Sequence, residues 1–215
     1  MASIRSKNAR GARRKHPPRS TISLESRERL RRQYRPRRVR ILFVGEAPPA
    51  SGRFFYHADS GLYRAIRDAF ATVFPSLRSS DGRFLESFRA MGCYLVDLCG
   101  KPVDRLDRTS RRCVCEAGEA RLAHRLRKLR PIIIVTVVRS IGSNVRRAEA
   151  AAGWCGLHLE LPYPGRWHRF RLTFRRKLTP VLRSALRSKQ EAPDLRRTYQ
   201  SHIGRHVVSS TTVAA

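Results

Sequence analysis

The apolar positions of the sequence fall into short continuous runs and longer periodic stretches. Four runs of strand length, rich in Val, Ile, Leu and Phe, occupy residues 39–45, 93–98, 132–138 and 156–161. Continuous runs bounded by Gly and Pro indicate strands that are buried on both faces of a parallel sheet. Between them, apolar side chains recur every three or four residues, which is typical of helices with one buried face. The order predicts a three-layer α/β/α sandwich with a four-stranded parallel sheet.

The periodic stretches place five helices around this sheet. They are expected at residues 60–74, about 82–90, about 114–130, about 140–152 and, after the turn at 162–165, along a basic stretch to 187. Residues 101–112, between the second strand and the third helix, are basic and are predicted to form a loop. Residues 39–187 therefore form one α/β domain.

Two flanking segments lack this patterning. Residues 1–38 contain 14 Lys and Arg but two Glu, with no apolar periodicity, and are predicted to be a disordered basic arm. Such an arm binds a nucleic-acid backbone without reading its sequence, although an Arg- and Ser-rich start is also typical of an organelle transit peptide. Residues 188–215 are expected to be a loose C-terminal tail.

The net charge of the chain indicates which kinds of molecule it binds. The chain carries 46 Lys and Arg against 16 Asp and Glu, a formal net charge of +30, which predicts binding to polyanions by counterion release. A bias toward arginine codons explains Arg over Lys, but it does not explain this imbalance. No run approaches the roughly 18–20 apolar residues that cross a membrane. We therefore expect contact with nucleic acid, no membrane partner and a cytoplasmic location, nucleoid-associated if the protein is bacterial.

The five cysteines do not form a metal-binding pattern. Their odd number, with no secretory segment, favours reduced thiols, and the spacing of Cys113 and Cys115 is not that of a zinc site. We expect no metal and no cofactor.

Two carboxylates end neighbouring strands of the predicted sheet. Glu46 follows the first strand in the segment Gly45-Glu46-Ala47-Pro48-Pro49, and Asp97 ends the second. Ligands of open α/β sheets bind outside the carboxyl ends of the strands, so both side chains are candidates for one pocket. The alternatives are a solvated Glu46 in a tight turn, and an Asp97 that caps a helix or pairs with an arginine.

Five segments, in this order, resemble motifs of the uracil-DNA glycosylase superfamily, nearest the branch with a Gly-Glu-Ala-Pro-Gly motif. They are Val39–Pro48, Phe54-Phe55 with the following Gly61-Leu62-Tyr63, Tyr94–Lys101, Leu129–Val135 and Leu161–Gly165. The resemblance covers about residues 39–187. It implies a monomeric DNA repair hydrolase, acting on double- or single-stranded DNA, that flips out a damaged or deaminated, uracil-like base and hydrolyses its N-glycosidic bond.

The resemblance also implies roles for individual residues. Glu46 would be the catalytic carboxylate that assists water or the oxocarbenium-like sugar, and Phe55 or Phe54 would stack on the base. The residues expected to contact the base are Ala47, Phe54, Phe55, Asp97 and Tyr163. The segment 166–170 would be a loop that wedges into the minor groove. The residues expected to contact DNA are Arg53, Arg166, Trp167, His168 and Arg169.

Three positions, and the absence of early cysteines, depart from the family pattern. Asp97 replaces an Asn, and an ionised carboxylate can only accept hydrogen bonds. Tyr163 replaces a His, Pro49 replaces a Gly and so removes an N–H donor, and no cysteine precedes Cys93 to hold an iron–sulfur cluster. The expected function is a monofunctional, metal-free glycosylase. The alternatives are an inactive nucleic-acid-binding protein of the same fold and an RNA-binding protein that uses only its basic arm.

Overall fold

The computed structural model describes residues 23–78, 83–165 and 167–187. Its sheet holds four parallel strands in the order β2-β1-β3-β4. The strands are β1 (Ile41–Gly45), β2 (Cys93–Asp97), β3 (Ile133–Thr136) and β4 (Leu157–Glu160). β1 and β3 lie in the centre, and every residue of β1, β2 and β3 is buried, as expected of strands covered on both faces.

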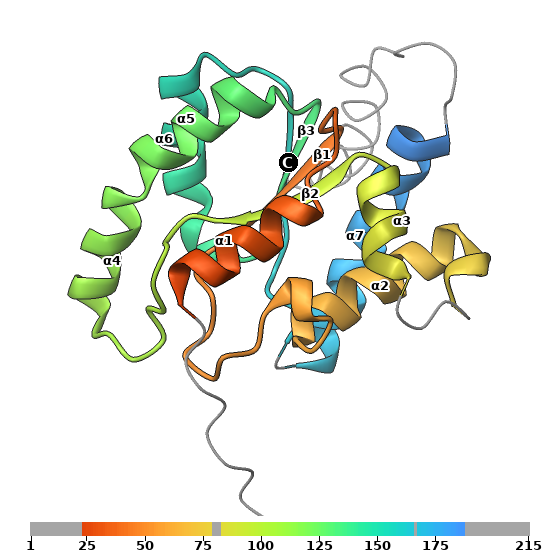
Figure 1. Ribbon diagram of the computed structural model, residues 1–215, viewed down its shortest axis with the longest axis horizontal. Helices are drawn as coiled ribbons and strands as arrows, with labels where there is room; N and C mark the ends of the chain where they lie inside the picture. Colours follow the sequence, from red (N-terminus) through yellow and green to blue (C-terminus); the bar gives the residue numbers. More distant parts are fainter. Residues whose placement is uncertain (1–22, 79–82, 166, 188–215) are drawn as a thin grey trace, which may run out of the picture.

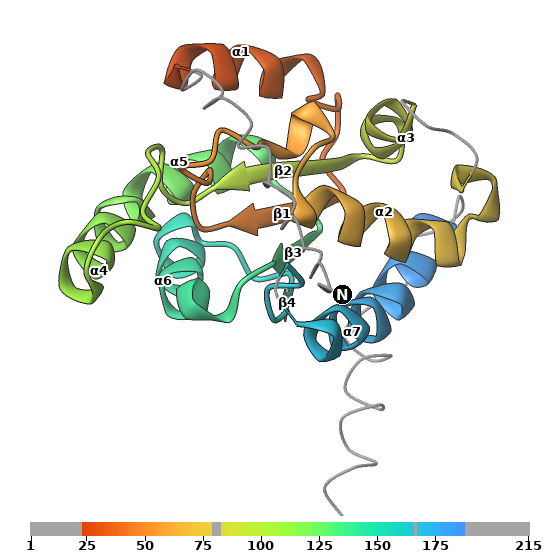
Figure 2. The same cartoon turned by 90° about the horizontal axis from the view of Figure 1, so that it is seen from below.

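Helices cover both faces of the sheet, so the predicted three-layer fold is confirmed (Figures 1 and 2). One layer contains α2 (Gly61–Val73), α3 (Phe84–Ala90) and α7 (His168–Arg187); the other contains α4 (Arg108–Ala117), α5 (Glu119–Leu129) and α6 (Gly142–Ala152). Short 3₁₀ turns lie at Phe55–His57, Pro75–Leu77 and Arg139–Ile141. In the first layer, fully buried Phe70, Phe84 and Phe88 pack on one another and on Phe43 of β1.

The predicted disordered arm is wrong for its second half, because residues Leu24–Gln33 form α1. Ser23 caps this helix, and α1 lies beside the β2 edge of the sheet (Figure 2). Its buried residues are Arg27 and Arg31, so it docks through arginines instead of an apolar stripe. A search for apolar periodicity therefore cannot detect it. Residues 1–22 of the predicted arm, and the predicted tail 188–215, lie outside the described residues.

The predicted helix 114–130 is two helices, and part of the predicted basic loop 101–112 is helical. α4 begins at Arg108, where the Asp107 carboxylate accepts hydrogen bonds from the N–H groups of Thr109 and Ser110. It ends at Gly118, where a Cβ atom would lie 2.6 Å from the Leu98 carbonyl oxygen. Glycine at 118 thus lets the chain pass against the end of β2 before α5 begins.

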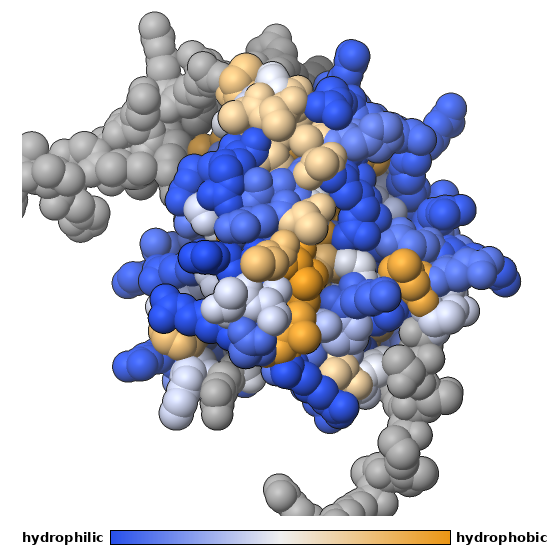
Figure 3. Space-filling model, turned by 90° about the vertical axis from the view of Figure 1, so that its left-hand side faces the viewer, coloured by the Kyte–Doolittle hydropathy of each residue, from blue (hydrophilic) through white to orange (hydrophobic). Residues whose placement is uncertain are grey.

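The outside of the domain is hydrophilic over most of the side formed by α4, α5 and α6 (Figure 3). None of the helices in the described part of the chain has the length and apolar character needed to cross a membrane.

Candidate functional site

A cavity of about 300 Å³ lies at the carboxyl ends of β1 and β2. Glu46 and Asp97 both line it, because β1 and β2 pair in parallel with Gly45 opposite Asp97. The predicted meeting of the two carboxylates at one sheet edge is confirmed. The other residues of the predicted base-contacting set also line this cavity; they are Ala47, Phe54, Phe55 and Tyr163. Segments far apart in the sequence thus converge on one space the size of a small ligand.

Glu46 is held by Arg111, which projects from α4. The Arg111 Nε donates to Oε1 of Glu46 over 2.6 Å, and its Nη2 donates to Oε2. The Cys115 thiol lies 3.8 Å from Oε1 as a further donor. The Glu46 side chain is 13% exposed and that of Arg111 is 40% exposed. A carboxylate has about four lone-pair positions, so this pairing leaves Glu46 able to accept one more hydrogen bond inside the cavity.

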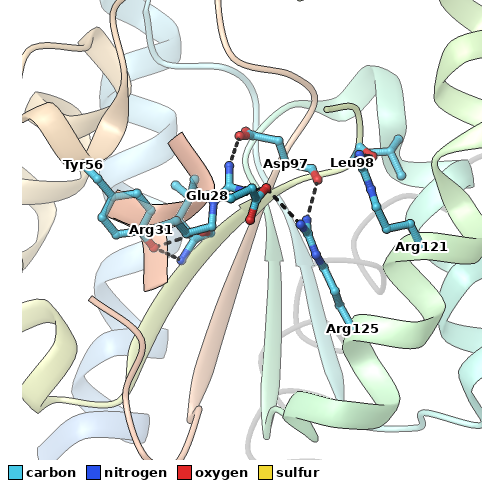
Figure 4. A network of polar contacts seen from close by, with 8 residues as sticks. Glu28, Arg31, Tyr56, Asp97, Leu98, Arg121 and Arg125 are labelled. Atoms are coloured by element: carbon cyan, nitrogen blue, oxygen red, sulfur yellow. Dashed lines mark hydrogen bonds and ion pairs between the residues drawn. The ribbon is translucent and has the colours of Figure 1, made fainter. Parts of the chain in front are cut away.

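Asp97 is buried at the end of β2 and pairs with an arginine, which was one of the sequence alternatives. Arg31 of α1 donates from Nη2 to Oδ2 of Asp97 over 2.7 Å (Figure 4). Its other oxygen, Oδ1, lies against Gly45, where a Cβ atom would approach it to 2.7 Å. Burial raises the pKa of Asp97, and the neighbouring Arg31 and Arg125 only partly offset that effect.

The aromatic residues of the cavity belong to the core as well. Phe54 and Phe55 are 2% and 3% exposed. Phe55 packs edge-on against Tyr56 and Tyr63, with ring centroids 5.0 and 5.8 Å apart, and the Arg31 guanidinium lies 5.5 Å from the Phe54 ring centroid. Both rings line the cavity and are fixed by these contacts, so they form a rigid apolar part of its wall.

Tyr163 is the exposed member of the set, with 45% of its surface accessible. Its ring folds back over Gly165, where a Cβ atom would lie 2.2 Å from the ring, so residue 165 must be glycine for this arrangement. The tyrosine hydroxyl can donate or accept a hydrogen bond at the cavity.

The predicted wedge loop is wrong for its second half. His168 and Arg169 lie in the first turn of α7 instead of a loop, and Arg169 packs over the ring of Phe170 at 5.0 Å. Trp167, just before the helix, is 54% exposed. Arg166 lies outside the described residues. Arg53 is exposed in the loop before Phe54, and it is not among the cavity-lining residues.

Comparison with known proteins does not identify a family. The sequence matches no protein-family model and no curated protein. Functional inference therefore depends on the cavity and on the motif resemblance.

Two residues that position the carboxylates were missed by the sequence analysis. Arg31 belongs to the predicted disordered arm and Arg111 to the predicted basic loop, so both were read as solvated cations. The capping residue Asp107 was the available signal for Arg111, because it fixes the start of α4. Ser23 caps α1 in the same way and signals its start, but it does not single out Arg31 among the several arginines that surround it.

Two thiols lie beside Glu46 without a metal arrangement. Cys99 and Cys115 are buried with their sulfurs 3.6 Å apart. In the described ranges, no three His, Cys, Asp or Glu side chains are grouped so that they could hold a metal ion.

Thiol alkylation should separate the five cysteines. Burial raises the pKa of Cys99 to about 12, and it also raises the pKa of Cys115 and Cys93, so these thiols stay protonated at pH 8. Iodoacetamide should modify exposed Cys113 and Cys155 in the folded protein, and all five cysteines only in urea. Mass spectrometry of the digested protein checks this; rapid labelling of Cys99 in the native state would contradict the packing of α4.

Proposed function

We propose that the protein is a monomeric DNA glycosylase that removes a flipped, damaged or deaminated base by hydrolysis. The observation that carries the proposal is the convergence of Glu46, Asp97, Phe54, Phe55 and Tyr163 on one cavity at the carboxyl edge of the sheet. These residues come from the segments that resemble the glycosylase motifs. The net charge of +30 supports a polyanionic substrate.

The reaction needs a nucleophile, a leaving group and a place for the base. In the proposed mechanism the base stacks on the Phe54 and Phe55 wall, and Asp97 accepts a hydrogen bond from an N–H group on its edge. The bond between C1′ and the base nitrogen breaks, and its electron pair leaves with the base. Glu46 orients a water molecule, stabilises the positive charge that develops on the sugar and takes the proton as the water oxygen bonds to C1′.

Arg111 determines whether Glu46 is available for this step. Its guanidinium holds both carboxylate oxygens, yet its side chain is 40% exposed. The pair is bidentate and Glu46 is largely buried, so it is stronger than a surface ion pair, and Glu46 becomes available only when a competing anion draws the guanidinium away. Substrate phosphates attract the same guanidinium and favour this movement.

A panel of substrates tests the proposal. Purified protein is incubated with duplex and single-stranded oligonucleotides that carry uracil, hypoxanthine, xanthine or a mismatched base, and abasic sites are detected as alkali-labile nicks. We expect nicks at one class of base with the wild-type protein and none with Glu46→Ala. The control is Glu116→Ala, which removes a carboxylate from the outer part of α4 and should leave the nicks unchanged. Folded protein that nicks no oligonucleotide would refute the glycosylase.

One observation favours a second function, a nucleic-acid-binding protein that holds a base without cleaving it. Two of the three carboxylates that line the cavity are neutralised by arginines, Glu46 by Arg111 and Asp97 by Arg31. Such a protein would retain salt-dependent binding to the oligonucleotides of the panel without forming product. A fluorescence anisotropy titration on the same samples measures this binding. Binding without nicks would identify the second function, and nicks would identify the glycosylase.

A further inference from the structure

The two faces of β2 line two different cavities. Leu95 and Asp97 face the cavity described above, whereas Tyr94 and Val96 line a second one of about 220 Å³ between α1 and α5. This alternation follows from the two-residue period of a strand. Arg31 connects the two spaces, since it lines the second cavity and donates to Asp97 in the first (Figure 4).

The second cavity has an excess of positive charge. Its lining includes five permanent cations and one carboxylate, that of Glu28. The cations are Arg31, Arg32, Arg35, Arg125 and Lys128, and His124 lies beside them. Glu28 is already shared, because Arg31 donates to it and Arg125 donates to the same Oε1 atom over 3.1 Å. Burial, together with the charge of Arg31, lowers the pKa of Arg125, as expected where cations crowd one another.

The other three cations lie at the rim of the second cavity. Arg32, Arg35 and Lys128 are exposed at the cavity, and within residues 23–78, 83–165 and 167–187 none of them pairs with a carboxylate. Arg32 lies on α1 and Lys128 on α5, and Arg35 follows directly after the C-cap of α1. A floor formed by buried Arg31 and part-buried Arg125, below a rim of exposed cations, is an arrangement that binds phosphate oxygens, because guanidinium groups donate two parallel hydrogen bonds to them.

We propose that this cavity between α1 and α5 is a binding site for a phosphate group, distinct from the base-sized cavity and independent of the proposed glycosylase reaction. Arg125 and Arg31 form its floor, and Arg32, Arg35 and Lys128 close over the phosphate oxygens. The group is carried either by a nucleic-acid strand or by a free phosphate ester, and the shared chemistry is the phosphate dianion or diester.

Isothermal titration calorimetry with inorganic phosphate tests the site, using the full chain at pH 7 and constant ionic strength. We expect saturable binding of one phosphate to the wild type. The double variant Arg32→Ala/Lys128→Ala should weaken it on the order of tenfold or more, because two charge-assisted contacts are lost. The matched control Arg29→Ala/Arg112→Ala removes the same charge from exposed positions of α1 and α4 outside the cavity and should change the affinity less than twofold.

The outcomes show whether the site exists and which molecule carries the phosphate group. No saturable phosphate binding, or equal losses in the two double variants, would overturn the proposal. An oligonucleotide whose affinity falls more in Arg32→Ala/Lys128→Ala than in the control would assign the site to a strand phosphate. Equal losses with the oligonucleotide, together with a selective loss for inorganic phosphate, would assign it to a free phosphate ester. Circular dichroism of each variant confirms that α1 remains folded.

Discussion

Replacing Arg31 with methionine lowers the free energy of unfolding by about 3–5 kcal/mol, because it breaks a buried ion pair by removing one partner. The Arg31 side chain is 5% exposed and pairs with Asp97, which is 9% exposed, and with Glu28. Methionine retains most of the side-chain volume but leaves both carboxylates without their main cation. The cost arises because an unpaired buried charge is far less stable than a hydrated one. Urea denaturation at pH 7 measures it.

Arg29→Met on the same helix is the control. The Arg29 side chain is 75% exposed and lies 3.5 Å from an equally exposed Glu25, so the expected change is less than about 0.5 kcal/mol. Arg31→Met/Asp97→Asn should recover part of the loss, because the second change removes one orphaned charge. Two single variants of equal stability would show that α1 does not dock through Arg31.

The sequence was sufficient for the sheet because its strands are specified locally. Residues 41–45 and 133–136 are continuous β-branched and apolar runs with Gly or Pro at their ends, and both form central strands. Parallel pairing then places Glu46 and Asp97 at one edge without further information. The edge position of the cavity followed from this topology.

The ion pairs of the site could not be predicted in the same way. Arg31 and Asp97 are separated by 66 positions, and Arg111 and Glu46 by 65. A chain with 46 basic residues offers many candidate partners for each carboxylate, and local pattern does not rank them. α1 could not be predicted for the same reason. The arginines on its buried face cannot be told, from the sequence, from those of a solvated basic segment. The ion pairs of the site and the docking of α1 both depend on charged side chains that are far apart in the sequence.

Through its ion pairs, Arg31 affects both cavities as well as the docking of α1. It fixes α1 to the sheet, holds the carboxylate at the base of the first cavity and contributes to the floor of the second. Its pairing with Asp97 favours the ionised form of that carboxylate, which accepts hydrogen bonds and donates none. Under the proposed function, the base preference of the first cavity therefore depends on a helix that precedes the whole motif region.

Changing Asp97 to asparagine should shift the base preference of the proposed glycosylase toward uracil. The wild-type carboxylate matches an N–H group, such as an exocyclic amine, and repels the O4 carbonyl of uracil. An asparagine amide can donate to O4 and still accept from Arg31. We expect the ratio of kcat/KM for uracil to that for a mismatched cytosine to rise on the order of a hundredfold, because a site with mismatched polar groups discriminates strongly. Single-turnover assays on the two duplexes measure it.

The matched control is Asp104→Asn, which removes a second carboxylate that lines the same cavity and accepts from the Ala50 N–H. It should leave the ratio unchanged. Measuring the same ratio at lower pH is an independent check. Burial raises the pKa of Asp97 above the ordinary value for an aspartate, and the protonated side chain can donate a hydrogen bond. As pH falls toward that raised pKa, the wild-type ratio should move toward uracil, while that of Asp97→Asn stays constant. Equal shifts in Asp97→Asn and Asp104→Asn would mean that the net charge of the cavity, and not the hydrogen-bonding character of Asp97, selects the base.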